Sequence, residues 1–142
     1  GGNFFVSGAY VASDLWDNRL VKANEEDKKF AMEVLKYKWR VGQAARNGKV
    51  KSVASPFPEI TGSYTYYQDL NPESYVVESP DALEPAAQGA FTILRYSENN
   101  LSAGIAYKGN YKTCVLGFPF KAIRTVTERE LLMKAILTFF EH

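Results

Sequence analysis

The two patterns that decide the fold lie next to each other in residues 113–142, TCVLGFPFKAIRTVTERELLMKAILTFFEH. The first is the apolar run from Thr113 to Phe118, which is typical of a β-strand covered on both faces. Pro119 follows, and it has no backbone N–H to give to a neighbouring strand. We therefore expect a buried strand that ends before Pro119.

The second pattern is an amphipathic helix behind this strand. Thr127 and Glu130 have the spacing of a capping box, in which each side chain bonds the other residue's backbone N–H. Beyond them the apolar residues fall on one helical stripe: Leu131, Leu132, Ala135, Ile136, Phe139 and Phe140. A buried strand followed by such a helix predicts a layered α/β domain with this strand well inside the sheet.

Three consecutive strands are predicted before this helix, at 91–97, 102–107 and 111–118, and they form an antiparallel meander. Residues 98–100 make the first turn, and Gly109-Asn110 fits a two-residue type II′ hairpin turn. Residues 59–89 are rich in Pro, Asp and Asn and read as a long surface excursion, with room for short strands at 63–68 and 75–78. The length of 142 residues predicts a single α/β domain over residues 1–142.

The N-terminal half is predicted to begin with a strand at 3–6, a small-residue turn at 7–9 and a helical turn at 10–15. Asn24 is the expected N-cap of a longer helix, with Asp27 in the capping-box position. We expect this helix to extend to Arg40, with basic residues near its end, Gly42 as its stop, and a buried stripe of Phe30, Ala31, Val34, Leu35 and Val41. An alternating strand is predicted at 49–54.

Composition and charge exclude several function classes. The formal net charge of +1 gives no general attraction for nucleic acid, and no apolar run approaches the ~20 residues of a membrane span. Cys114 is the only cysteine and lies inside an apolar strand, so we expect it to be buried and inert. The only histidine is His142, so Ser-His and Cys-His nucleophilic schemes lack an interior base. No cofactor and no metal site are predicted.

Loop carboxylates are the remaining candidates for catalysis: Asp14, Asp17, Asp69, Glu73, Glu78 and Glu84. Asp14 and Asp17 are the best placed, because they follow the strand whose carboxyl end should face the crevice of an open sheet. Ser7, on the turn after that strand, is a third candidate, with backbone amides nearby as an oxyanion hole. Local capping and turn formation is the favoured interpretation of both aspartates.

Aromatic residues are the candidates for ligand contact. Several crowd the irregular excursion: Phe57, Tyr64, Tyr66, Tyr67 and Tyr75. Exposed rings there, together with Tyr10 and Trp16, could stack on sugars or dock another protein. Packing of a long loop is the favoured interpretation of the excursion's rings.

Two terminal motifs resemble a known group of proteins. GGNFFVSGAY (1–10) and LGFPFKAI (116–123), the latter followed by Arg129, Leu132 and Met133, are similar to segments of bacterial secreted proteins often labelled xanthan lyase. These proteins contain a domain similar to class I glutamine amidotransferases. The resemblance implies a flavodoxin-like, amidotransferase-like three-layer sandwich and a secreted, periplasmic or cell-surface location.

The same resemblance argues against amidotransferase activity. The family's cysteine nucleophile stands on the turn that is Ser7-Gly8-Ala9 in this chain, and its histidine and glutamate follow the strand that ends here in Phe118-Pro-Phe-Lys121. We therefore expect a non-catalytic module of a larger secreted or envelope protein, with a structural, docking or carbohydrate-binding role. The alternative is a hydrolase or polysaccharide lyase that acts at the carboxyl edge of the sheet.

The expected partners are other domains of the parent polypeptide, carbohydrate, or a second copy of the chain. The resemblance implies that further strands precede the first one, so we expect a fragment whose first strand lies at an exposed sheet edge. Phe4, Phe5 and Val6 make that edge apolar, which predicts a homodimer through edge pairing or element swapping. A compact monomer, with the 59–89 excursion folded over the edge, is the alternative.

Overall fold

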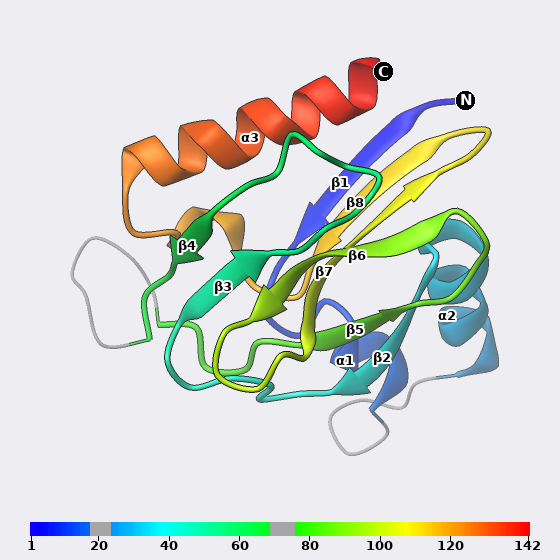
Figure 1. Ribbon diagram of the computed structural model, residues 1–142. Coiled ribbons are helices and arrows are strands. Elements are labelled where there is room, and N and C mark those ends of the chain that lie inside the picture. Colours follow the sequence, from blue (N-terminus) through cyan, green and yellow to red (C-terminus); the bar gives the residue numbers. More distant parts are fainter. Residues whose placement is uncertain (18–23, 69–75) are drawn as a thin grey trace.

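The computed structural model describes residues 1–17, 24–68 and 76–142 (Figure 1). Its elements in chain order are β1 (Asn3–Ser7), α1 (Ser13–Trp16), α2 (Glu25–Phe30), the π-helix η1 (Ala31–Leu35), β2 (Tyr37–Val41), β3 (Lys49–Ser52), β4 (Ser63–Thr65), β5 (Ala82–Pro85), β6 (Ala90–Tyr96), β7 (Ser102–Lys108), β8 (Lys112–Leu116), the 3-10 helix η2 (Phe120–Ala122) and α3 (Val126–Glu141).

The strands form two sheets. The main sheet has six strands in the order β1-β8-β7-β6-β3-β4, and β2 pairs with β5 in a separate two-stranded sheet. Only the β1–β8 pair of the main sheet is parallel; its other pairs are antiparallel. The protein is therefore mixed α/β with a buried final strand, as predicted, but the finer flavodoxin-like arrangement is not confirmed.

Each face of the main sheet has its own core. On β8, Cys114 and Leu116 pack toward α3, where Leu132, Ala135, Ile136 and Phe139 are buried against them. Val115 points to the opposite face and packs with Leu35 of η1, Tyr37 of β2 and Leu83 of β5. Figure 1 shows α3 on one side of the sheet and α1, α2, β2 and β5 on the other. The alternation of side chains along β8 thus builds both layers.

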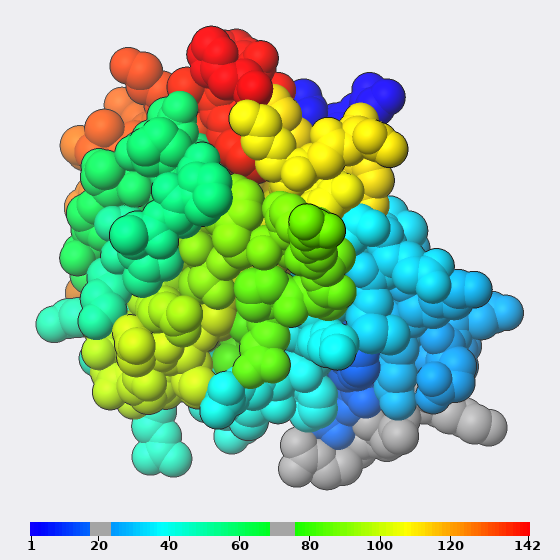
Figure 2. Space-filling model, turned by 45° about the vertical axis from the view of Figure 1, so that its right-hand side comes forward, coloured from blue at the N-terminus to red at the C-terminus, as the bar shows by residue number. Residues whose placement is uncertain are grey.

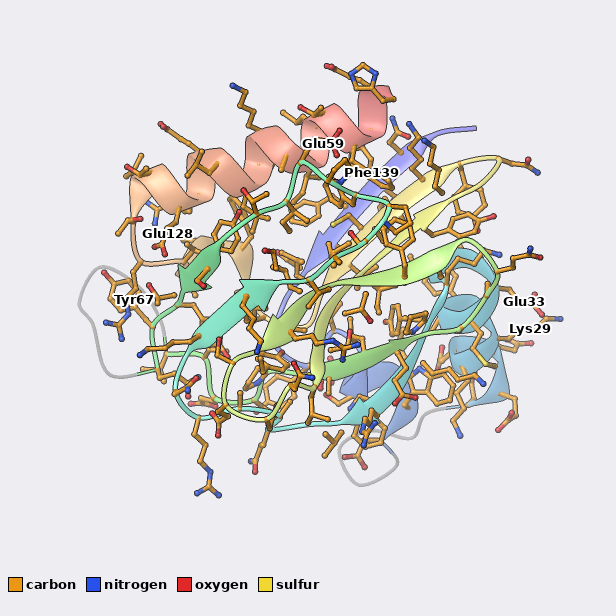
Figure 3. All side chains as sticks on the ribbon, in the orientation of Figure 1. Lys29, Glu33, Glu59, Tyr67, Glu128 and Phe139 are labelled. Carbon is orange, nitrogen blue, oxygen red and sulfur yellow. The ribbon has the colours of Figure 1, made fainter. Side chains whose placement is uncertain are left out.

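Helix α3 is the long C-terminal helix that was predicted, but it begins earlier. Thr125, rather than Thr127, is the N-cap, and its side chain accepts a hydrogen bond from the Glu128 backbone N–H at 3.1 Å. Leu131 was predicted in the buried stripe but is 57% exposed. Phe139 lies on the side that faces the sheet (Figure 3), with its ring 4.5 Å from that of Phe57.

The predicted helix from Asn24 to Arg40 is wrong in its second half. The capping box of Asn24 and Asp27 is present. However, the helical segment ends at Lys36, which has a left-handed φ of 68°, and residues 37–41 form β2 instead. Of the predicted buried stripe, Phe30, Val34 and Val41 are exposed and only Ala31 and Leu35 are buried.

Two further strand predictions differ from the structure. The predicted strand at 75–78 is not formed at 76–78, Tyr75 lies outside the described residues, and β5 forms at 82–85 instead. The β7–β8 hairpin is present, but Lys108 pairs with Lys112, so three residues form its turn. Gly109 lacks the positive φ that a type II′ turn requires.

In the described ranges, no helix is long and apolar enough to cross a membrane.

Candidate functional site

The open edge of the main sheet is the feature with the clearest capacity for binding. In β1, the Gly8 N–H donates to the Leu116 carbonyl at 3.4 Å, and the Gly2 carbonyl accepts from the Lys112 N–H at 3.1 Å. Backbone groups of alternate residues in a strand point to opposite sides. The even-numbered residues therefore bond β8, and the N–H and C=O groups of Asn3, Phe5 and Ser7 point away from the sheet. We call these outward groups the β1 edge.

The opposite edge of the sheet, at β4, is capped at Thr65 by the chain itself. The Thr65 N–H donates to Glu128 Oε1 at 3.1 Å, and the Thr65 carbonyl accepts from the Arg124 N–H at 2.8 Å. Figure 3 shows Glu128 at the start of α3, next to β4. Within residues 1–17, 24–68 and 76–142, no strand pairs with the outer side of β1. The β4 edge is therefore capped at Thr65 by its own chain, whereas β1 ends the sheet without a further strand.

An apolar groove flanks β1 on the side of α2. This groove, which we call the Phe4 groove, is a cavity of about 350 Å³ lined by Gly2, Asn3, Phe4, Phe30, Val34, Leu35, Tyr111 and Thr113. Phe4 is 53% exposed, and Phe30 and Val34 are exposed beside it.

A second apolar groove lies on the side of α3. This α3 groove has a volume of about 640 Å³ and is lined by Phe120, Val126, Arg129, Glu130, Met133, Lys134, Leu137, Thr138 and Glu141. It borders β1 because the ring of Phe120 stands edge-on to that of Phe5, with centroids 5.9 Å apart. Of the seven exposed large apolar residues in the described part of the chain, five line these two grooves: Phe4, Phe30, Val34, Val126 and Leu137.

The β1 edge lacks the devices that usually protect an exposed strand. Its sequence, Asn-Phe-Phe-Val-Ser, contains no charged residue and no proline. Its start is fixed to the rest of the molecule, because Asn3 Nδ2 donates to the Phe140 carbonyl at 3.3 Å. On the neighbouring strand β8, Lys112 Nζ donates to the carbonyl of Phe139 in α3 at 2.9 Å. Figure 2 shows the N-terminal residues, the end of α3 and the β7–β8 hairpin together at one end of the molecule.

Ser7, Asp14 and Asp17 line neither the Phe4 groove nor the α3 groove. Another predicted candidate, Glu84, lies on β5 and pairs with Arg40 at 2.9 Å. The Ser7 hydroxyl is half-buried and accepts a hydrogen bond from the Phe120 N–H at 3.2 Å. Asp14 is exposed on α1, whereas Asp17, which follows α1, is buried. Asp69 and Glu73 lie outside the described residues. Among the described residues, no group of three or more His, Cys, Asp or Glu could hold a metal ion.

The aromatic candidates divide into core and surface residues. Tyr64 and Tyr66 are buried, which confirms the packing interpretation and removes them as exposed stacking rings. Tyr66 stacks on Phe118 with centroids 5.1 Å apart. Tyr67 is half-buried beneath the Arg124 guanidinium, at 5.2 Å. Tyr10 and Trp16 are also half-buried; Tyr10 has a left-handed φ of 64°, and Lys28 Nζ lies 5.9 Å from the Trp16 ring.

Asp81 is the unusual carboxylate that sequence reasoning missed. It is fully buried immediately before β5. Its Oδ2 accepts from the backbone N–H of Ala12 at 2.8 Å and of Ser13 at 3.0 Å, at the start of α1. Its Oδ1 and the indole Nε1 of Trp39 are both buried without a hydrogen-bond partner. Asp81 thus holds the α1 segment to the β2–β5 layer.

Burial determines the ionisation of Asp81. Removal from water raises the pKa of the carboxyl above its ordinary value, because the charged form loses hydration. Hydrogen bonds from Ser13 and Ala12 lower the pKa, but they do not outweigh the burial. Burial also raises the pKa of the Tyr37 hydroxyl, and the nearby Asp81 charge adds a smaller increase. This hydroxyl donates to the Val11 carbonyl at 2.9 Å.

Comparison with known proteins gives no relative from which a function could be transferred. No family model, no curated protein and no solved structure matches the chain.

Proposed function

We propose that the protein is a non-catalytic docking module whose working surface is the β1 edge with its two flanking grooves. The observation that carries this proposal is the difference between the two edge strands of the main sheet, β1 and β4. The outward backbone groups of Thr65 on β4 are bonded by Glu128 and Arg124, whereas the outward groups of β1 meet no strand among the described residues. A strand of this kind is a template for pairing with another chain.

The occupant of the edge is a second copy of the chain, paired antiparallel about Phe5. In this register Phe5 faces Phe5 of the second copy, and Asn3 faces Ser7 of the second copy. All of these residues have outward backbone groups, so each opposed pair exchanges N–H···O=C bonds, as in a regular antiparallel ladder. A strand that pairs with itself in this way forms a closed two-fold dimer rather than an open chain of molecules.

The side chains around β1 suit the same arrangement. On the face of the Phe4 groove, Phe4 comes opposite Val6 of the second copy, and this contact covers an exposed ring with apolar surface. A two-fold axis perpendicular to the sheet places the α3 helices of the two copies on the same face, opposite the Phe4 groove. The charged lining of the α3 groove is Arg129, Lys134, Glu130 and Glu141, with equal numbers of each sign. A surface of balanced charge can complement an identical surface.

The wider identity of the module rests on the sequence resemblance. We propose an amidotransferase-like, flavodoxin-like domain from a secreted, periplasmic or cell-surface protein, docked to other domains of its parent. A carbohydrate-binding role through the half-buried rings of Tyr10, Trp16 and Tyr67 is a second form of the same proposal. The hydrolase or lyase alternative has less support, because the Phe120 N–H engages the Ser7 hydroxyl and Asp14 is exposed.

A charge placed on the edge tests the docking proposal. Phe4→Lys adds a cation to the exposed side of β1, where pairing would require its desolvation, so we expect the variant to be monomeric. Light scattering after size exclusion, over a range of concentrations, measures the mass. Wild type should approach twice 15.9 kDa as the concentration rises.

Val41→Lys is the matched control, because Val41 is also an exposed apolar strand residue but lies on β2, outside both grooves. This variant should associate like wild type. Equal weakening of association by both substitutions would contradict the proposed surface, and a wild-type monomer at every concentration would contradict self-docking.

A further inference from the structure

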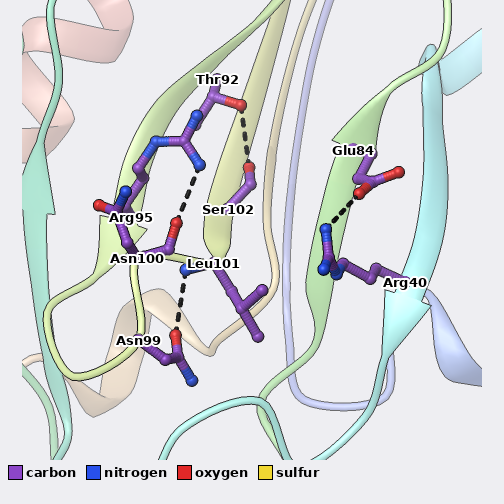
Figure 4. A network of polar contacts seen from close by, with 8 residues as sticks. All are labelled: Arg40, Glu84, Thr92, Arg95, Asn99, Asn100, Leu101 and Ser102. Carbon is purple, nitrogen blue, oxygen red and sulfur yellow. Dashed lines mark hydrogen bonds and ion pairs between the residues drawn. The ribbon is translucent and has the colours of Figure 1, made fainter.

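A polar cleft lies away from the β1 edge, between the two sheets. It has a volume of about 380 Å³ and is lined by Arg40, Glu84, Pro85, Thr92, Arg95, Asn100, Leu101 and Ser102. Figure 4 shows Arg40 and Glu84 on the neighbouring strands β2 and β5, and the other polar residues on β6, β7 and the turn between them. Its lining contains two guanidinium groups and one carboxylate, an excess of one positive charge.

Irregular strand pairing gathers these side chains. In a regular strand, residues 92 and 95 would point to opposite faces of the sheet. The β6–β7 pairing shifts between Thr92 and Leu94, where Ile93 is an extra residue, and Thr92 and Arg95 both line the cleft. Arg40 is likewise the unpaired residue where the β2–β5 register shifts between Trp39 and Val41. Such bulges redirect side chains and are common beside binding sites.

The guanidinium of Arg95 is held in place by the turn that follows it. One of its terminal nitrogens donates to the Asn100 carbonyl at 2.9 Å. Asn100 has a left-handed φ of 63°, and its N–H donates to the Tyr96 carbonyl at 2.9 Å. The Asn99 side chain accepts from the Leu101 N–H at 3.0 Å. A guanidinium has five N–H donors, so this contact leaves others for a ligand.

The remaining polar groups also make internal contacts that a ligand can extend or replace. The Thr92 hydroxyl donates to the Ser102 hydroxyl at 3.1 Å. Arg40 pairs with Glu84 Oε1 at 2.9 Å, and both side chains are about half exposed. An exposed ion pair of this kind adds little stability, so a ligand carboxylate can take the place of Glu84.

We propose that this cleft binds a small hydroxylated carboxylate. The guanidinium groups of Arg40 and Arg95 would bind the carboxylate, because their planar N–H pairs match its two oxygens. The Thr92 and Ser102 hydroxyls and the Asn100 amide suit hydroxyl groups on the same ligand. Leu101 and Pro85 are the only apolar residues of the lining, and no aromatic ring is present in it. A neutral sugar or an apolar ligand therefore lacks a platform on which to stack.

Titration with three small molecules tests this site. Gluconate carries a carboxylate and hydroxyl groups, sorbitol is its neutral polyol counterpart, and inorganic phosphate is an anion of different geometry. We expect gluconate, but not sorbitol, to shift the backbone amide resonances of residues 95 and 100–102 in a saturable manner. Phosphate should bind more weakly than gluconate. Saturable shifts with sorbitol, or phosphate binding without gluconate binding, would overturn the proposal.

Three variants locate the binding. Arg95→Ala should weaken gluconate binding about tenfold, since it removes a charge-assisted hydrogen-bond donor. Glu84→Gln frees Arg40 and should tighten binding about twofold to fivefold. Arg46→Ala removes an exposed arginine outside the cleft and should leave the affinity unchanged. If Arg95→Ala and Arg46→Ala lowered the affinity for gluconate equally, general surface charge would explain the binding and the proposed site would be wrong. Weaker gluconate binding by Glu84→Gln would contradict the role given to Arg40.

Discussion

Asp81 connects segments that are far apart in the chain. Its side chain binds the start of α1, its N–H donates to the Gly117 carbonyl at 2.7 Å, and its carbonyl accepts from the Tyr96 hydroxyl at 2.6 Å. A β-carbon at Gly117 would lie 2.0 Å from the Asp81 carbonyl oxygen, so the approach of the two chains there requires glycine. Asp81 therefore determines how the β2–β5 layer meets the end of β8.

The raised pKa of Asp81 gives a prediction on stability and pH. A carboxyl whose pKa is higher in the folded state binds its proton more tightly there than in the unfolded chain. Its contribution to the free energy of unfolding is therefore largest at low pH and falls as the pH rises above the ordinary value of 3.8. Asp81→Asn removes this titration. We expect the stability of wild type relative to the variant to decrease as the pH rises through this window.

Urea unfolding of both proteins between about pH 3.5 and pH 7 measures this difference. Asp14→Asn is the control, since Asp14 is an exposed carboxylate on α1, and it should not reproduce the trend. A wild-type advantage that grows with pH would mean that the charged form of Asp81 stabilises the fold, contrary to this account.

Sequence could not reveal Asp81, because its partners lie 68 and 69 residues away. The segment Ser79-Pro-Asp81 has the composition of an exposed turn. Burial of Tyr64 and Tyr66, by contrast, follows from the general need of a long loop to cover apolar surface. The exclusion of an interior histidine required no structure at all.

At the scale of the element, the start of α3 was ambiguous in the sequence. Thr125 precedes Glu128 by three residues, and Thr127 precedes Glu130 by three, so two capping boxes overlap. The structure uses Thr125 as the N-cap. Its hydroxyl donates to Glu128 Oε2 at 2.8 Å, and Glu128 Oε1 accepts from the Thr65 N–H on β4. A long-range contact therefore accompanies the cap that forms, and local spacing could not have shown it.

The two threonines give a direct test of this assignment. Thr125→Ala should lower the free energy of unfolding by about 1 kcal/mol, because the Glu128 N–H loses its acceptor. Thr127→Ala lies within the first turn and should change it by less than about 0.5 kcal/mol. Thermal or urea unfolding measures both. A larger decrease in the free energy of unfolding for Thr127→Ala than for Thr125→Ala would mean that Thr127 is the N-cap.

The segment 37–41 shows why the helix prediction ran too long. Tyr-Lys-Trp-Arg-Val alternates large and charged residues, which is the period of a strand, and it contains three good strand formers. The basic residues at 36, 38 and 40 look equally like a helix C-terminus. Pairing with β5, more than 40 residues later in the sequence, selects the strand. The β6–β8 meander needed only local turns, and its prediction is confirmed.

At the scale of the whole molecule, the position of β1 at an edge of the main sheet confirms the sequence prediction. The parallel β1–β8 pair joins the two ends of the chain, and α3 packs over it (Figure 1). The expectation of an edge strand came from the resemblance, which implies further strands before the first one, and the apolar residues at 4–6 supported the dimer prediction only. The separate β2–β5 sheet pairs segments far apart in the chain, and the polar cleft is lined through strand irregularities; hydrophobic periodicity encodes neither.

Amide hydrogen exchange at Phe5 tests the central claim most directly. The N–H groups of Phe4 and Val6 face β8 and should exchange slowly at every concentration, whereas the Phe5 N–H points outward from the sheet. If β1 pairs with a second copy, the Phe5 amide exchanges rapidly in dilute protein and becomes protected as the concentration rises. A Phe5 amide that exchanges at one rate across the whole concentration range, while Phe4 and Val6 stay protected, would contradict docking at the β1 edge.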